Sequence, residues 1–109
     1  MKEIVEYLNR KNVIFKSLKH ITPKELGSRK KVALYLGVNL KGFYAIVMRV
    51  QKKSRVVRKE ADELMQLHRA LENYIDSRIM LKYIIIDAPI CSQAKAMLEA
   101  HEWKVWVGV

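Results

Sequence analysis

The sequence predicts an α/β domain in which a mixed β-sheet carries helices on both faces. The elements expected along the chain follow the order α-β-β-β-α-β-α-β, which favours layered packing of helices on a sheet. Residues 43–51 are almost wholly apolar, as expected of a central strand buried on both faces. An amphipathic helix of about 20 residues separates them from the apolar run 81–87, and such a crossover joins parallel strands.

The N-terminal part predicts a helix, a strand and a short helical turn. Residues 2–10 are expected to form a helix because apolar side chains recur at helical spacing, at Ile4, Val5 and Leu8. Residues 12–21 open with alternating, β-branched side chains and are expected to be a strand. Residues 22–25 match a capping box with proline at the first helical position, and Gly27 ends the turn.

The middle of the chain predicts two strands and the long helix. The strands are expected at residues 31–38 and 43–51, with a turn over residues 37–42. The basic stretch 51–58 is expected to be a loop, and Ser54 is a candidate cap for the following helix. The apolar stripe of that helix consists of Val57, Ala61, Leu64, Leu67, Leu71, Tyr74 and Ile75.

The C-terminal part adds two strands and a helix. Residues 81–87 are expected to form the fourth strand, and residues 103–107 alternate as the last one. Between them a third helix is indicated by Ala94, Met97 and Leu98. Successive strand side chains point to opposite faces, so Trp103 and Trp106 are expected on opposite sides, one in the core and one exposed.

Length and composition indicate one domain, over residues 1–109. Half of the residues are apolar and 29% are charged, the balance of a globular chain rather than a disordered one. The apolar run 83–86 is far shorter than the roughly 20 residues of a membrane span, and no signal peptide is visible. Cys91 is the single cysteine, which excludes an intramolecular disulfide and suits a cytoplasmic location.

Charge is distributed unevenly along the chain, whose formal net charge is +10. Residues 10–59 contain fifteen lysines and arginines and one acid, Glu25, whereas residues 60–109 contain five basic and eight acidic residues. Surfaces charged only for solubility usually intersperse both signs. The basic half therefore predicts a polyanionic partner, DNA or RNA, bound through residues 10–59.

Several short motifs follow one another in a recognisable order. They are a Gly/Asn turn at 37–42 (GVNLKG), an apolar strand at 43–46 (FYAI), a basic loop at 52–57 (KKSRVV), a helix start at 59–61 (KEA), and a closing strand and helix at 84–89 (IIIDAP) and 94–96 (AKA). In this order the chain resembles the core of the PD-(D/E)XK nuclease superfamily, which includes restriction endonucleases and archaeal Holliday-junction resolvases. The resemblance implies a restriction-endonuclease-like α-β-β-β-α-β core, extended here by a C-terminal helix and strand.

The resemblance also implies where a catalytic centre would lie. The family has an Asp near the end of the second core strand and a Glu-X-Lys motif at the end of the third. Here those positions fall on residues 34–36 (LYL) and 47–49 (VMR), so no acid is present at either. Mg²⁺ requires hard oxygen ligands, which Val47 does not supply. The resemblance thus implies a degenerate site around Tyr35, Val47 and Arg49, with no catalytic residue assigned and no metal or other cofactor.

Arg49 is expected to share a strand face with Val47 and to keep the positive charge of the family's lysine. A guanidinium can hold a phosphate bidentately but cannot act as a base at neutral pH. We therefore expect a nucleic-acid-binding protein that has lost metal-dependent cleavage. The residues expected to contact phosphates are Lys30, Lys31, Arg49, Lys52, Lys53, Arg55 and Arg58.

Two other interpretations stay open. In one, the chain is an active Mg²⁺-dependent nuclease whose acids have moved, with Glu3, Glu6, Glu25, Glu60 and Asp87 as candidates. In the other, it is a non-enzymatic structural or adaptor subunit whose basic face meets an acidic protein. Asp87 could also cap the helix that follows it, and its role is left open.

The remaining reactive side chains do not form a recognisable motif. His20, His68 and His101 are far apart and lack metal-ligand spacing, and His68 is expected to pack in the core beside the helix stripe. Cys91 is expected to be a buried, inert thiol.

The last strand predicts self-association. It is expected near a sheet edge, where an uncovered apolar strand risks aggregation. Trp103 or Trp106 would then be buried in a two-fold homodimer formed by the C-terminal half.

Overall fold

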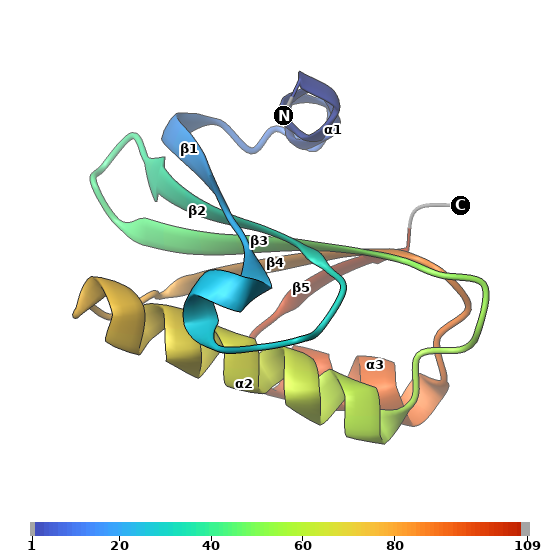
Figure 1. Ribbon diagram of the computed structural model, residues 1–109. Coiled ribbons are helices and arrows are strands. Elements are labelled where there is room, and N and C mark those ends of the chain that lie inside the picture. Colours follow the sequence, from blue (N-terminus) through green and yellow to red (C-terminus); the bar gives the residue numbers. More distant parts are fainter. Residues whose placement is uncertain (1, 108–109) are drawn as a thin grey trace.

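The computed structural model describes residues 2–107, which fold around a five-stranded sheet of order β1-β2-β3-β4-β5 (Figure 1). The strands are β1 (Phe15–Ile21), β2 (Ala33–Asn39), β3 (Tyr44–Gln51), β4 (Leu81–Asp87) and β5 (Lys104–Val107). The first three pair antiparallel, whereas β3 with β4 and β4 with β5 pair parallel. The mixed sheet predicted from the sequence is therefore confirmed, as is the parallel crossover through the long helix.

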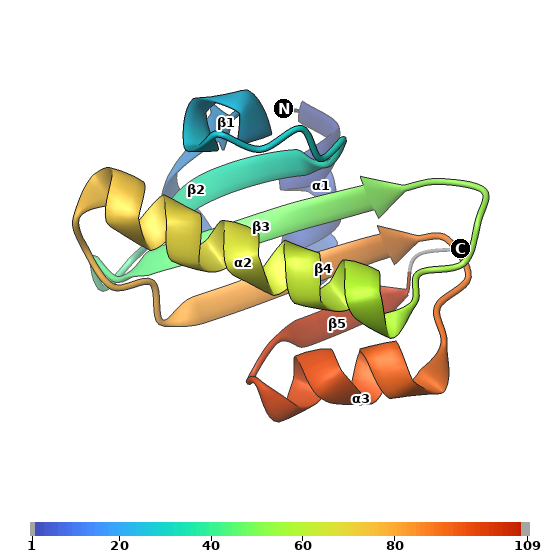
Figure 2. The ribbon, with the colours of Figure 1, turned by 60° about the horizontal axis from the view of Figure 1, so that its bottom comes forward.

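The helices cover both faces of the sheet, as predicted. They are α1 (Lys2–Arg10), the 3-10 turn η1 (Pro23–Leu26), α2 (Arg58–Ile75) and α3 (Ser92–Ala100). Helix α1 lies alone on one face, and α2 and α3 lie side by side on the other (Figures 1 and 2). None of these helices combines the length and apolar character needed to cross a bilayer.

Two apolar cores result from this layering. The larger one, between the sheet and α2 with α3, contains Met48 of β3 and Leu64 of α2. The smaller one, between the sheet and α1, contains Val47 of β3 and Ile4 of α1. Because neighbouring residues of β3 enter opposite cores, this strand is buried on both faces, as its continuous apolar sequence predicted.

Three boundaries near the N-terminus differ from the prediction. β1 starts at Phe15 rather than at residue 12, because Asn12 takes a positive φ of 61° that ends α1 and turns the chain. β2 spans residues 33–39, so Gly37 lies within the strand and the turn covers residues 39–42. The ring of Phe15 packs directly against Gly37, so that a Cβ at this position would be crowded by the ring.

The start of α2 also differs from the prediction. Val57, not Ser54, occupies the position before the helix, and it provides no side-chain cap. Val57 and Tyr74 are exposed, whereas the central positions of the stripe are buried at Ala61, Leu64, Leu67 and Leu71. The two ends of the predicted stripe therefore extend beyond the part of the helix that the sheet covers.

The two tryptophans face opposite sides of the sheet, as alternation predicted. Trp103 is only 4% exposed and packs edge-on against His68 in the larger core. Trp106 is half-buried rather than exposed, because its ring stacks on Tyr83 and contacts Tyr7 of α1. The prediction that one tryptophan is exposed is thus wrong, although β5 does lie at a sheet edge.

Candidate functional site

The predicted basic residues converge on one end of the sheet, where β3 and β4 finish. Gln51 lies opposite Asp87 in the parallel pair, and Ala33 lies opposite Arg49 in the antiparallel pair. The basic segment that precedes β2 therefore reaches the same end as the loop that follows β3. Ligands of open α/β sheets bind outside the carboxyl ends of the strands, which makes this end the candidate site.

On the α1 side of this end, the positions implied by the nuclease resemblance are neighbours. Tyr35 is the register partner of Val47, and Arg49 follows on the same face. The Nε of Arg49 donates a hydrogen bond of 2.8 Å to Oδ2 of Asp87, and its Nη1 lies 3.9 Å from Oε2 of Glu3. Asp87 therefore pairs with Arg49, and Cys91, not Asp87, precedes α3 as its cap.

Tyr7 of α1 belongs to the same cluster. Burial raises the pKa of the Tyr7 phenol, and the negative charge of Asp87 raises it further. The phenol therefore stays protonated and neutral at physiological pH. Around Arg49, the α1 side presents two carboxylates and a neutral hydroxyl, and Arg10 and Lys11 lie over the ring of Tyr7.

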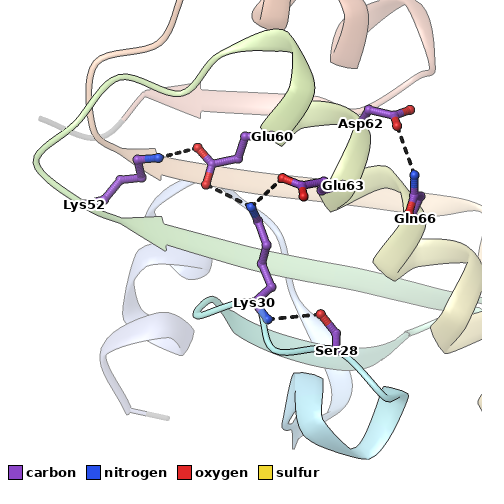
Figure 3. A network of polar contacts seen from close by, with 7 residues as sticks. All are labelled: Ser28, Lys30, Lys52, Glu60, Asp62, Glu63 and Gln66. Carbon is purple, nitrogen blue, oxygen red and sulfur yellow. Dashed lines mark hydrogen bonds and ion pairs between the residues drawn. The ribbon is translucent and has the colours of Figure 1, made fainter.

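On the α2 side, acids of the helix hold two of the predicted phosphate-binding lysines (Figure 3). Glu60 contacts the Nζ of Lys52 through Oε1 at 2.5 Å and that of Lys30 through Oε2 at 3.2 Å. Lys30 also donates to Oε1 of Glu63 at 2.9 Å. Burial opposes ionisation of Glu60, but the hydrogen bonds from Lys52 and Lys30 outweigh it and leave its pKa below the ordinary value.

The seven predicted cations thus divide into two sets. Lys30, Arg49 and Lys52 are half-buried and paired with acids. Four exposed cations make no ion pair with any other residue between 2 and 107, and we call them the free cations: Lys31, Lys53, Arg55 and Arg58.

Sequence reasoning missed the acids that hold the first set. The one local signal was the position of Glu60 and Glu63, one turn apart at the start of the helix that follows the basic loop. Lys30 lies 33 residues before Glu63, so its pairing depends on how the β-sheet places the two segments.

Four of the five acids considered for a migrated metal centre already have other partners, and Glu60 is held by Lys30 and Lys52. Glu25 closes the capping box of η1 through the backbone N–H of Thr22. Glu3 and Asp87 approach each other only through Arg49, whose guanidinium lies against both. Among residues 2–107, no three carboxylate, imidazole or thiol side chains gather as a metal site. Mg²⁺ is usually held by one or two carboxylates together with waters and phosphates, and here a guanidinium occupies the space between Glu3 and Asp87.

His68 and Cys91 have local structural roles. The Nε2 of His68 lies 3.0 Å from the carbonyl oxygen of Ile79, and the ring packs against Trp103, in agreement with a packed histidine. Cys91 is half-buried rather than buried, and its Sγ accepts a hydrogen bond of 3.3 Å from the N–H of Ala94 at the start of α3.

The fold of this domain is similar to that of repair endonucleases of known structure. The apo form of EndoMS superimposes with a TM-score of 0.57 at 15% identity, over 96% of this chain and 44% of that one. A repair endonuclease from Pyrococcus abyssi gives 0.56 at 14% identity, over 97% and 44%. A complex of EndoMS with dsDNA gives 0.53 at 14% identity, over 95% and 42%.

These likenesses show the fold, and the chain spans less than half the length of the structures it matches. No protein-family model matches the chain. No curated protein matches it by sequence.

Proposed function

We propose that this chain binds DNA or RNA through the free cations and does not cleave it efficiently. The observation that carries the proposal is the position of the free cations, which lie just before β2 and just after β3. At that end of β3, Val47 and Arg49 stand at the positions that the resemblance assigns to the catalytic motif. Contacts from such side chains to phosphates give affinity and position the ligand without reading sequence. EndoMS, which shares the fold, has been solved as a complex with dsDNA, and this supports a nucleic-acid partner.

Charge at the site supports binding more than catalysis. Arg49 stands where the nuclease resemblance implies a lysine, and a guanidinium stays protonated at neutral pH and cannot act as a base. Val47 stands where that resemblance implies a metal-binding acid, and its side chain offers no oxygen. Phosphates can therefore be attracted to this end of the sheet without an activated water to attack them.

The test is the salt dependence of binding to a labelled DNA duplex. Replacing Lys53, Arg55 and Arg58 together by alanine is expected to make the slope of log K against log salt less steep by about 2.7, at about 0.9 per lost phosphate contact. The matched control replaces Arg69, Arg78 and Lys104, which are also exposed, so the net charge changes equally. An unchanged slope in the first variant would contradict the assignment of the free cations.

An active nuclease is the second candidate, and the likeness to solved endonucleases supports it. In this candidate Glu3 and Asp87 would have to leave the guanidinium of Arg49 before they could hold a metal ion. This candidate predicts nicking of duplex that requires Mg²⁺ or Mn²⁺ and stops in Asp87→Asn. Absence of nicking by the wild-type chain with either ion would rule it out. If the wild-type chain binds neither DNA nor RNA at low salt, an adaptor role toward an acidic protein is favoured instead.

We also propose that the chain works in a reducing compartment such as the cytoplasm, which suits the free Cys91.

We further propose that two copies form a homodimer through the C-terminal half. Trp103 cannot form the interface, because it is already buried within one copy. Half-buried Trp106, on the edge strand β5, is the remaining candidate. Sedimentation equilibrium at about 100 µM, well above a micromolar Kd, is expected to show a dimer that Trp106→Ala weakens. A monomer at that concentration would contradict this.

A further inference from the structure

The ammonium groups of Lys30 and Lys52 converge on a single carboxylate. They come from separate segments, one before β2 and one directly after β3, and each contacts a different oxygen of Glu60. Figure 3 shows Lys30 lying between Glu60 and Glu63, with Lys52 on the far side of Glu60. Each carboxylate oxygen of Glu60 thus pairs with one ammonium group, as two oxygens of a phosphate would.

The same side chains line an open groove of about 960 Å³ between the segment before β2 and the first half of α2. The charged residues along it are Arg29, Lys30, Lys31, Lys52, Glu60 and Glu63. Arg29 and Lys31 are exposed and make no ion pair with the rest of residues 2–107. Four cations therefore face one groove, and two of them are balanced by acids of the protein itself.

We propose that Glu60 is an internal competitor for phosphate, which keeps Lys52, and together with Glu63 also Lys30, from contacting a nucleic acid bound at this end of the sheet. The inference rests on the proposed function and deepens it, because it states which cations of the site contact the ligand. Glu60 is held more firmly than an exposed acid, since its side chain is only 15% exposed and has two partners. Its ion pairs persist in the complex, and the free cations make the phosphate contacts.

The experiment compares Glu60→Gln with the wild-type chain on one DNA duplex across a salt series. The amide keeps the shape of the side chain but removes the charge, which releases Lys52 toward phosphate, whereas Lys30 keeps its pair with Glu63. The one new contact, from Lys52, is expected to steepen the slope of log K against log salt by about 0.9. At low salt the Kd is expected to fall about fivefold. Thermal unfolding of each variant checks that the fold is kept.

Two controls separate release of Lys52 from a general gain in charge. Glu99→Gln changes the net charge equally, and Glu99 is exposed near the end of α3, at the opposite end of the sheet. It is expected to leave the slope unchanged. Replacing Lys30 and Lys52 by methionine is expected to cancel the gain in the Glu60→Gln background and to leave the wild-type slope nearly unchanged.

The outcomes distinguish this inference from the proposed function. If the wild-type chain binds and Glu60→Gln gives the same slope, the role of Glu60 is wrong and the proposed function stands. The inference would also be overturned if removing both lysines from the wild-type chain made the slope less steep by about 1.8. In that case the lysines would already contact phosphate. If no variant binds duplex, single-stranded DNA or RNA at low salt, the proposed function itself fails.

Discussion

Arg49 and Asp87 connect the carboxyl ends of two parallel strands through a hydrogen bond of 2.8 Å. Arg49 pairs in register with Ile85. Asp87 lies two residues further along β4, so its side chain is on the same face of the sheet as that of Arg49. The two side chains are 24% and 20% exposed, which places the pair between a surface ion pair and a buried one. The positive charge that the nuclease resemblance places at this position is therefore balanced within the protein.

The Arg49–Asp87 pair is expected to stabilise the fold measurably. Arg49→Met and Asp87→Asn should each lower the free energy of unfolding by about 1 kcal/mol, since each leaves a half-buried charge without its partner. The double variant should lose less than the sum of the two, by a coupling of about 0.5–1 kcal/mol. Urea denaturation of the four proteins measures this coupling. Additivity within about 0.3 kcal/mol would show that the hydrogen bond contributes nothing.

Glu60 is expected to make stability depend on pH in the acid range. The pKa of its carboxyl is lower in the folded chain than its ordinary value of 4.5, so the folded state favours the ionised form. The stabilisation is therefore fully present above pH 4.5 and is lost as the pH falls through the folded-state pKa. In Glu60→Gln the free energy of unfolding should fall less steeply below pH 4.5. Equal slopes for the two proteins would contradict the pairing with Lys30 and Lys52.

Elements with a strong local pattern were predicted to the residue or nearly so. Helix α1 and strand β4 have the predicted bounds, because their apolar spacing is complete within each element. Tyr35, Val47 and Arg49 also lie close together, since strand alternation and register fix their positions. These features could be predicted because they depend on patterns among residues that are close together in the sequence.

The parts that sequence reasoning missed depend on contacts between distant segments. Nothing near Lys30 indicates Glu63, and nothing near Arg49 indicates Asp87, 38 residues later. Without the sheet register, all seven cations appeared equally available to a phosphate. Trp106 was expected to be exposed for the same reason, because its cover comes from α1 at the other end of the chain.

A side chain at position 37 is expected to be crowded by the ring of Phe15. A Cβ at this position would lie 3.0 Å from Cδ1 of Phe15, closer than such carbons normally approach. Gly37→Ala should therefore lower the free energy of unfolding by about 1–3 kcal/mol, the usual cost of overpacking. The cost should shrink in a Phe15→Leu background, where the ring is absent.

A matched glycine separates crowding from backbone strain. Gly27 takes a φ of 75° and has open space around its Cα. Gly27→Ala should also lower the melting temperature, but through strain alone, and Phe15→Leu should not relieve it. If Phe15→Leu relieves neither substitution, or both alike, the crowding at Gly37 is not the cause.

Cys91 is expected to stabilise α3 as its N-terminal cap. Its Sγ accepts a hydrogen bond from the N–H of Ala94, one of the donors that the first helical turn leaves unpaired. Cys91→Ser and Cys91→Ala both remove the sulfur and its apolar contacts, but the serine hydroxyl can still accept that bond. The serine variant should therefore unfold with a free energy about 1 kcal/mol higher than the alanine variant, as measured by urea denaturation. Equal stability of the two variants would mean that the cap contributes nothing and that the thiol acts only by packing.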